Sequence, residues 1–130
     1  MGGEKRLDTL LKTMEPTLNA GKYVFCQLPE TATIQQSEIV MVFREQEGNT
    51  VIIGKEHADQ LKLEYTFIAA WITLTVHSSL EAIGLTAAFS NALSKAGISC
   101  NVVAAFHHDH IFVDHLKANA ALEVLRTLAK

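Results

Sequence analysis

The amino-acid sequence predicts an α+β fold of the ferredoxin-like type, βαββαβ, in two interlocked units whose antiparallel sheets are packed by helices. The order strand, helix, strand, strand, helix in residues 67–130 is the first reason, because it is this fold without its last strand. The second is that 48% of the 130 residues are hydrophobic, enough for a buried core. Since an open sheet edge is a liability, we expect the N-terminal half or a second subunit to supply the fourth strand.

Residues 67–76 predict a long strand, which the helix of this half follows. Ser78-Ser79-Leu80-Glu81 has the spacing of a capping box, in which Ser78 accepts from the Glu81 amide and the Glu81 carboxylate accepts in return. We expect the helix to open there and to end at Gly97, a typical C-terminal cap.

Two more strands and a helix complete the second half. The strands are expected at residues 100–106 and 111–113, on either side of His107-His108-Asp109-His110. Asp114 is placed to cap the last helix. The inner face of that helix should carry Ala118, Ala121, Leu122, Leu125 and Leu128.

The first half predicts a short helix near residues 7–14, which Pro16 discourages from continuing. Strands are expected at residues 23–28, 38–44 and 50–53, and the last two should form a hairpin. Residues 29–37 predict a loop, and residues 55–61 one or two helical turns with Ala58 and Leu61 facing inward. We therefore divide the chain into an N-terminal unit, 1–66, and a C-terminal unit, 67–130.

Charge and cysteine usage exclude several classes of function. The net charge is −3 and no segment gathers Lys and Arg, so we expect no nucleic-acid partner. No apolar run is long enough to span a bilayer, so we expect no membrane partner. Cys26 and Cys100 lie far apart in apolar runs, which favours buried thiols in a reducing compartment. The expected location is the cytoplasm.

Two long runs resemble a bacterial family of tandem ACT domains. They are ITLTVHSSLEAIGLTAA at residues 72–88 and AGISCNVVAAFHHDHIFV at residues 96–113. Residues 8–11, 23–25 and 43–48 are similar to the first unit of that family. The chain more distantly resembles the paired ACT units of aspartate kinases and arginine sensors. It departs from the family at Asp114-His115, where a proline is common.

The resemblance implies a non-catalytic regulatory protein that binds an amino acid or similar metabolite at an interface between ACT units. In relatives the ligand lies near the loop after the first strand and the middle hairpin. The candidate ligand-binding residues are therefore His77, Ser78, Ser79, Leu80, Glu81, Gly84, His107, His108, Asp109 and His110. A helix N-terminus suits an α-carboxylate, and Asp109 or Glu81 suits an ammonium group.

Each candidate also has a purely structural interpretation. Ser78 and Glu81 can serve only to cap the helix, and Gly84 can serve close packing rather than a ligand. On its other face the helix carries small residues that could pack on another unit. This face and the missing strand favour a homodimer or higher homo-oligomer.

The histidine cluster raises the alternative of a metal-binding protein. Three imidazoles and a carboxylate are ligand types that first-row metals prefer. Strand alternation, however, puts His108 and His110 on one face and His107 and Asp109 on the other. We therefore expect no metal. The sequence also has no Gly-rich phosphate loop, no nucleophile elbow and no spaced set of cysteine ligands, so we expect no cofactor and no enzyme activity. An oligomerisation or interaction module without a ligand stays open beside the ligand-binding interpretation.

Overall fold

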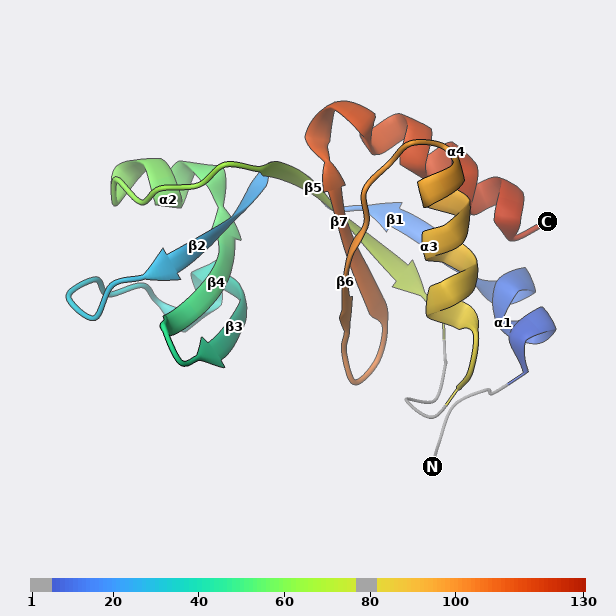
Figure 1. Cartoon of the computed structure of the whole chain (residues 1–130), viewed down its shortest axis with the longest axis horizontal. Coiled ribbons are helices and arrows are strands. Elements are labelled where there is room, and N and C mark those ends of the chain that lie inside the picture. Colours follow the sequence, from blue (N-terminus) through green and yellow to red (C-terminus); the bar gives the residue numbers. More distant parts are fainter. Residues whose placement is uncertain (1–5, 77–81) are drawn as a thin grey trace. The chain divides into compact units, whose positions relative to one another are not determined.

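The computed structural model describes residues 6–76 and 82–130, and the chain divides into two compact units (Figure 1). Residues 21–69 form the smaller unit. Residues 1–20 and 70–130 form the larger one. This grouping differs from a division after residue 66, because the first helix and strand pack with the second half of the chain.

The larger unit has a sheet in the order β1-β5-β7-β6, and α3 and α4 lie on one side of it (Figure 1). Strand β5 starts two residues before this unit and runs through it. The elements are α1 (Leu7–Thr13), β1 (Glu15–Leu18), β5 (Ile68–Thr75), α3 (Leu85–Lys95), β6 (Asn101–Ala104), β7 (Asp109–Asp114), the 3₁₀ helix η2 (His115–Lys117) and α4 (Ala118–Leu128).

The fourth strand of this sheet comes from the N-terminal half of the chain. This was one of the two expected sources, the other being a second subunit. β1 pairs antiparallel with β5, from Glu15 opposite Thr75 to Leu18 opposite Ile72. The segment around Pro16 carried no strand prediction. A proline is tolerated here because β1 is an edge strand, which need not donate every amide to a ladder.

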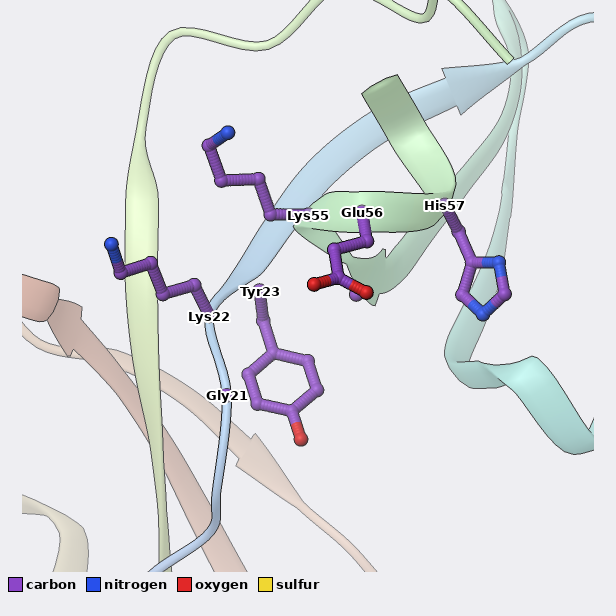
Figure 2. A pocket seen from close by; sticks show the side chains of 7 residues that line it. Gly21, Lys22, Tyr23, Lys55, Glu56 and His57 are labelled. Atoms are coloured by element: carbon purple, nitrogen blue, oxygen red, sulfur yellow. The ribbon is translucent and has the colours of Figure 1, made fainter. Parts of the chain in front are cut away.

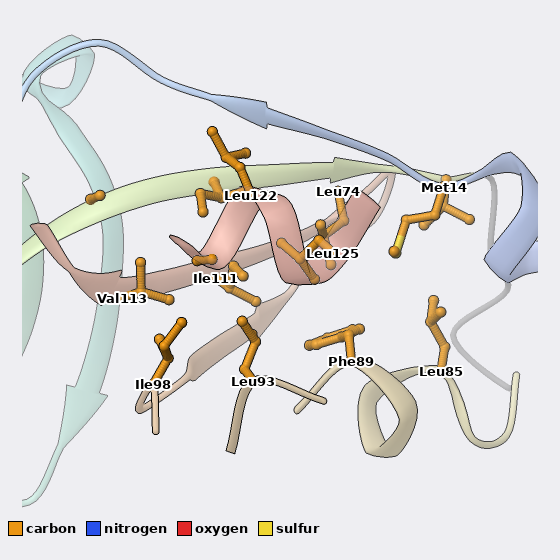
Figure 3. Packing of buried hydrophobic residues seen from close by; sticks show 14 of the residues in the cluster. Met14, Leu74, Leu85, Phe89, Leu93, Ile98, Ile111, Val113, Leu122 and Leu125 are labelled. Carbon is orange, nitrogen blue, oxygen red and sulfur yellow. The ribbon is translucent and has the colours of Figure 1, made fainter. Parts of the chain in front are cut away.

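A single hydrophobic core lies between the sheet and the helices of the larger unit (Figure 3). Phe89 and Leu93 of α3 meet Leu125 of α4 there, and all three are fully buried. Met14, which follows α1, is 2% exposed and belongs to the same core. The N-terminal segment is therefore an integral part of this unit.

The strands of the smaller unit lie in the order β3-β4-β2-β5. In both units the first strand along the βαββαβ order lies between the third and the fourth, so the two sheets have the same topology. The smaller unit has fewer helices. The first two residues of β5 close this sheet, since Val24 pairs with Ile68 and Tyr23 with Ala69. A loop and a 3₁₀ helix stand where the first helix of a βαββαβ unit would be. The elements are β2 (Tyr23–Leu28), η1 (Gln36–Glu38), β3 (Ile39–Glu45), β4 (Gly48–Gly54) and α2 (Lys55–Gln60). Among these, the strands at 23–28 and 39–45 confirm the sequence prediction.

The helix of the second half begins later than the capping box predicts. Residues 82–84 are not helical, and α3 begins at Leu85 after Gly84, which has a left-handed φ of 96°. The expected box itself, Ser78 to Glu81, lies outside the described residues. An inward-facing Leu61 is also wrong, because this side chain is 39% exposed just beyond α2.

The predicted cap at Gly97 is confirmed, whereas Asp114 caps the 3₁₀ helix η2 and α4 itself has no side-chain cap. Gly97 has a φ of +77°, and the Ile98 amide donates to the Leu93 carbonyl at 2.9 Å, which is the Schellman arrangement. Asp114 accepts from the Leu116 amide at 3.0 Å and so caps η2 ahead of α4. None of the helices in residues 6–76 and 82–130 has the length and apolarity to cross a membrane.

Candidate functional site

The candidate residues that the structure describes lie in two segments at one end of the larger unit. The β6–β7 turn and the start of α3 lie at the same end of this unit (Figure 1). His107 to His110 and Gly84 are described there. His77, Ser78, Ser79, Leu80 and Glu81 lie outside the described residues, so their predicted roles stay predictions.

The β6–β7 turn carries His107 and His108 next to an exposed aromatic ring. Phe106 is 82% exposed, and its ring meets the His107 ring edge-on with centroids 4.9 Å apart. The Ala105 amide donates to the His108 carbonyl at 3.0 Å, which closes the turn. The turn therefore holds two imidazoles and a phenyl ring at the end of the hairpin.

Asp109, the first residue of β7, is the buried carboxylate of this region. It is 7% exposed, and by strand alternation it shares the helix-facing side of the sheet with the core residues Ile111 and Val113. Burial raises the pKa of the Asp109 carboxyl above its ordinary value, and the charge of His108 opposes that effect. The Asp109 oxygens are not among the buried side-chain atoms of residues 6–76 and 82–130 that have no hydrogen-bond partner.

His110 faces the other side of the same strand and belongs to a polar network. The Trp71 indole Nε1 donates to His110 Nδ1 at 3.0 Å, and Thr73 Oγ1 lies 3.1 Å from the same nitrogen. Asn19 Nδ2 in turn donates to Thr73 Oγ1 at 2.9 Å. Because an indole N–H can only donate, Nδ1 is the acceptor and a neutral His110 carries its proton on Nε2. Burial, and then His108, lower the pKa of His110.

This arrangement separates residues that are adjacent in the sequence. Asp109 and His110 point to opposite faces, as strand alternation predicts. In the described part of the chain, no three His, Cys, Asp or Glu side chains are grouped so that they could hold a metal ion. The described residues therefore give the metal-binding alternative no ligand set.

Gly84 lies against the side chain of Leu7. A Cβ at this position would lie 3.3 Å from Cδ2 of Leu7, on α1. The positive φ and this contact together account for a glycine here. The close-packing interpretation of Gly84 is thus supported by geometry.

Sequence reasoning missed the partners of His110. Both Trp71 and Thr73 lie in the strand expected at residues 67–76, but nothing in the sequence pairs them with a residue 37 or 39 positions later. Asn19, directly after β1, also bonds across to Thr73 of β5. Only the period-2 pattern of β5 gave a signal, since it puts Trp71 and Thr73 on the same face.

A separate cavity of about 520 Å³ lies in the smaller unit, beside the start of α2 (Figure 2). Lys22 and Lys55 extend to one side of it and His57 to the other, with Tyr23 and Glu56 between them. The Lys55 ammonium is already 2.7 Å from Asp59 Oδ2. The cationic groups do not converge, so this cavity has no evident ligand chemistry.

The fold and the site define a small α+β protein with two ferredoxin-like units in one chain. Family models described as "ACT domain" match residues 2–70 and residues 67–127. The chain belongs to the ACT domain family.

Solved structures agree with this assignment. A Vibrio cholerae protein, described as of unknown function and a possible transport protein, is 46% identical with a TM-score of 0.82, covering 95% of this chain and 96% of its own. An Agrobacterium tumefaciens protein is 15% identical, with a TM-score of 0.66 and 89% of both chains covered. The regulatory subunit of aspartate kinase from Thermus thermophilus is 9% identical, with a TM-score of 0.61, over 88% of this chain and 97% of that one. The last two show the fold alone. No curated protein matches the chain.

ACT domains are regulatory modules that bind small molecules, so family membership supports a regulatory ligand-binding role in general. The matched family is not a catalytic one.

Proposed function

We propose that the protein is a non-catalytic sensor that binds an amino acid or similar small metabolite at an interface between ACT units. One observation carries the proposal. Asp109, at the head of β7, is a buried carboxylate at the end of the larger unit where the β6–β7 turn and the start of α3 both lie. A ligand with an ammonium group would neutralise it. The expected cellular location stays the cytoplasm, and a homo-oligomer stays the expected assembly.

Thermal unfolding of the purified chain against a panel of L-amino acids tests this proposal. A compound that binds only the native state raises stability by RT ln(1 + [L]/Kd), about 2.7 kcal/mol at a hundredfold excess over Kd. We expect one or a few amino acids to raise Tm in a concentration-dependent way, and nucleotides to leave Tm unchanged. Unchanged Tm with every amino acid would refute an amino-acid sensor.

An interaction module is the second candidate, and a specific surface favours it. The outer side of α3 and α4 has an apolar groove of about 480 Å³, lined by Ala92, Val124, Thr127 and Leu128 beside Glu123. Sedimentation velocity, together with the thermal unfolding above, separates the two candidate functions. A stable oligomer without any response to amino acids would favour the module, whereas an amino-acid response favours the sensor.

A further inference from the structure

Strand β3 lies at one edge of the sheet of the smaller unit, beside β4 (Figure 1). Among the strands of residues 6–76 and 82–130, β1, β3 and β6 each pair with a single neighbour. β1 and β6 have four residues each, and β1 contains Pro16. Short strands and prolines keep a sheet edge from pairing with another chain. β3 has seven residues and no proline, so its free side is open to a further strand.

The exposed apolar side chains of β3 lie on both faces of this edge. Phe43 is 62% exposed and Val42 is 50% exposed, more than any other large apolar side chain of residues 21–69. Because they are neighbours in a strand, they point to opposite faces of the sheet. A helix or loop that packs on one face would cover only one of them. A further strand beside β3 would cover both.

The β3–β4 hairpin determines which backbone groups of β3 are available to such a strand. A two-residue turn joins Glu45 to Gly48, and these two residues pair across the hairpin. The pair that closes a two-residue turn is hydrogen-bonded, and bonded and non-bonded pairs then alternate along the ladder. The backbone of Phe43 therefore bonds to β4. The amides and carbonyls of Val42 and Arg44 point away from β4 and can bond to another strand.

We propose that β3 pairs antiparallel with the β3 of a second copy of the chain, about a twofold axis at Phe43. Val42 then lies opposite the partner's Arg44, and Arg44 opposite the partner's Val42, so the available backbone groups of both strands bond to each other. Phe43 faces the partner's Phe43 in a non-bonded pair with Cα atoms about 4.5 Å apart, where aromatic rings pack favourably. The same surface is used on both copies, so the assembly closes as a dimer.

Charge and strand regularity favour this register over its neighbours. Two identical strands could in principle centre their twofold axis on any residue of β3. An axis at Arg44 or Glu45 would set like charges directly opposite each other, which is destabilising. An axis at Val42 would need Val40 for its outer bonds, and the ladder changes register around Val40. An axis at Phe43 avoids both problems.

Sedimentation velocity of the full chain at pH 7.5, over a range of concentrations, tests this interface. The variant Phe43→Lys sets two positive charges opposite each other at the axis. Leu61→Lys is the matched control, because it adds the same charge at a 39% exposed leucine of the same unit. We expect dimers of the wild type and the control. For Phe43→Lys we expect cooperative thermal unfolding, as in the wild type, and a dimer Kd raised about a hundredfold or more.

Cysteine cross-linking with diamide reports the register, and it does not depend on whether Phe43→Lys folds. Phe43→Cys should form a disulfide-linked dimer, because its two Cα atoms lie within the span of a disulfide, about 4.4 to 6.8 Å. Val42→Cys is the control. Its two copies are offset by two residues along the strands and lie about 8 Å apart, too far for a disulfide. The wild type should stay unlinked, since Cys26 is buried and burial raises the pKa of Cys100 to about 11.

Four results would overturn the proposal. The first is a wild type that is monomeric at every concentration. The second is a dimer that Phe43→Lys does not weaken, which would put the interface elsewhere. The third is equal cross-linking of Phe43→Cys and Val42→Cys. The fourth is a series of species larger than a dimer, which would indicate head-to-tail pairing of β3 with β6 and growth without closure. None of these results bears on amino-acid binding, which thermal unfolding tests separately.

Discussion

Asp109 and His110 are neighbours in β7 whose pKa values shift in opposite directions for the same reason. Burial disfavours the charged form of each group, so the pKa of the Asp109 carboxyl rises and that of the His110 imidazole falls. The carboxylate faces the helices, and the imidazole faces Trp71 and Thr73 on the other side of the sheet. Acid therefore neutralises the Asp109 carboxylate more readily, and protonates the His110 imidazole less readily, than it would in an exposed side chain.

The Trp71–His110 hydrogen bond should make tryptophan fluorescence sensitive to acid. Protonation of Nδ1 would set it against the indole N–H, so the bond must break. The pKa of His110 lies below its ordinary value of 6.5. We therefore expect constant Trp71 emission between about pH 7 and 8 and a change only below pH 6.5. Trp71 is the only tryptophan, so the emission of the protein reports the surroundings of this one side chain.

Two variants check the assignment. His110→Gln should remove the acid transition of Trp71, whereas His107→Gln, in the exposed turn, should keep it. The folded protein binds fewer protons at residue 110 than the unfolded chain, so this group lowers stability as pH falls through 6.5. An unchanged transition in His110→Gln would contradict the assignment.

Protonation of Asp109 changes the stability of the fold in the opposite direction to protonation of His110. Its folded pKa is above the ordinary value of 3.8, so the folded protein binds more protons than the unfolded chain between the two values. The wild type should then gain stability relative to Asp109→Asn as pH falls through the folded pKa. Tm measured at intervals from pH 7.5 to pH 4 should show the difference between the two proteins shrinking. A constant difference would contradict a raised pKa.

For single residues, the sequence predicts which face of a strand a side chain occupies but not how deeply it is buried or what it contacts. Strand alternation was enough to separate Asp109 from His110. It does not show how deeply Asp109 is buried, because burial depends on the segments that pack over the start of β7. The bond from Trp71 to His110 spans 39 positions and follows from the sheet order, which local patterns do not contain.

For helix α3, the sequence predicts one end of the element correctly but not the other. Its end was predictable, because Gly97 provides a left-handed C-terminal cap. Its start was not, because the capping-box spacing at residues 78–81 precedes a non-helical stretch, residues 82–84. Leu7, from α1, packs against Gly84 at that start. A tertiary contact thus accompanies a boundary that local propensity misplaces.

Gly97→Ala should destabilise the larger unit by about 1 to 2 kcal/mol. An alanine at a φ of +77° is strained, although a Cβ there would meet nothing within 4 Å. Gly97→Asn should lose less, since asparagine adopts this conformation more readily. Urea unfolding followed by Trp71 fluorescence measures both variants in the unit that contains Gly97. Equal stability of the alanine variant and the wild type would contradict the strain argument.

On the scale of the whole molecule, the missing strand was predictable but its source was not. The order of elements in residues 67–130 leaves one place in the sheet empty, and β1 fills it beside β5. Pro16 lies in this strand and was read as the end of a helix. Four residues at a sheet edge give too short a pattern to be recognised, so only the pairing itself identifies them.

A fragment of residues 67–130 should therefore fail to fold alone. It lacks β1 and also Leu10 and Met14, which are 0% and 2% exposed in the core. A rearranged chain, with residues 70–130 joined by a Gly/Ser linker to residues 6–20, restores the order βαββαβ apart from α1. We expect cooperative thermal unfolding of the rearranged chain and none of the fragment. A folded fragment would show that β1 is dispensable.

The pairing of Tyr23 with Ala69 brings together the two ends of the smaller unit. The chain thus leaves the larger unit after Ala20 and returns at Ala70, with only one strand pair's width between the entry and exit of residues 21–69. A segment with adjacent ends is topologically an insertion, and insertions can be exchanged as cassettes. Another module with adjacent termini, such as a circularly permuted fluorescent protein, could be spliced in at these two joints without cutting the core of its host.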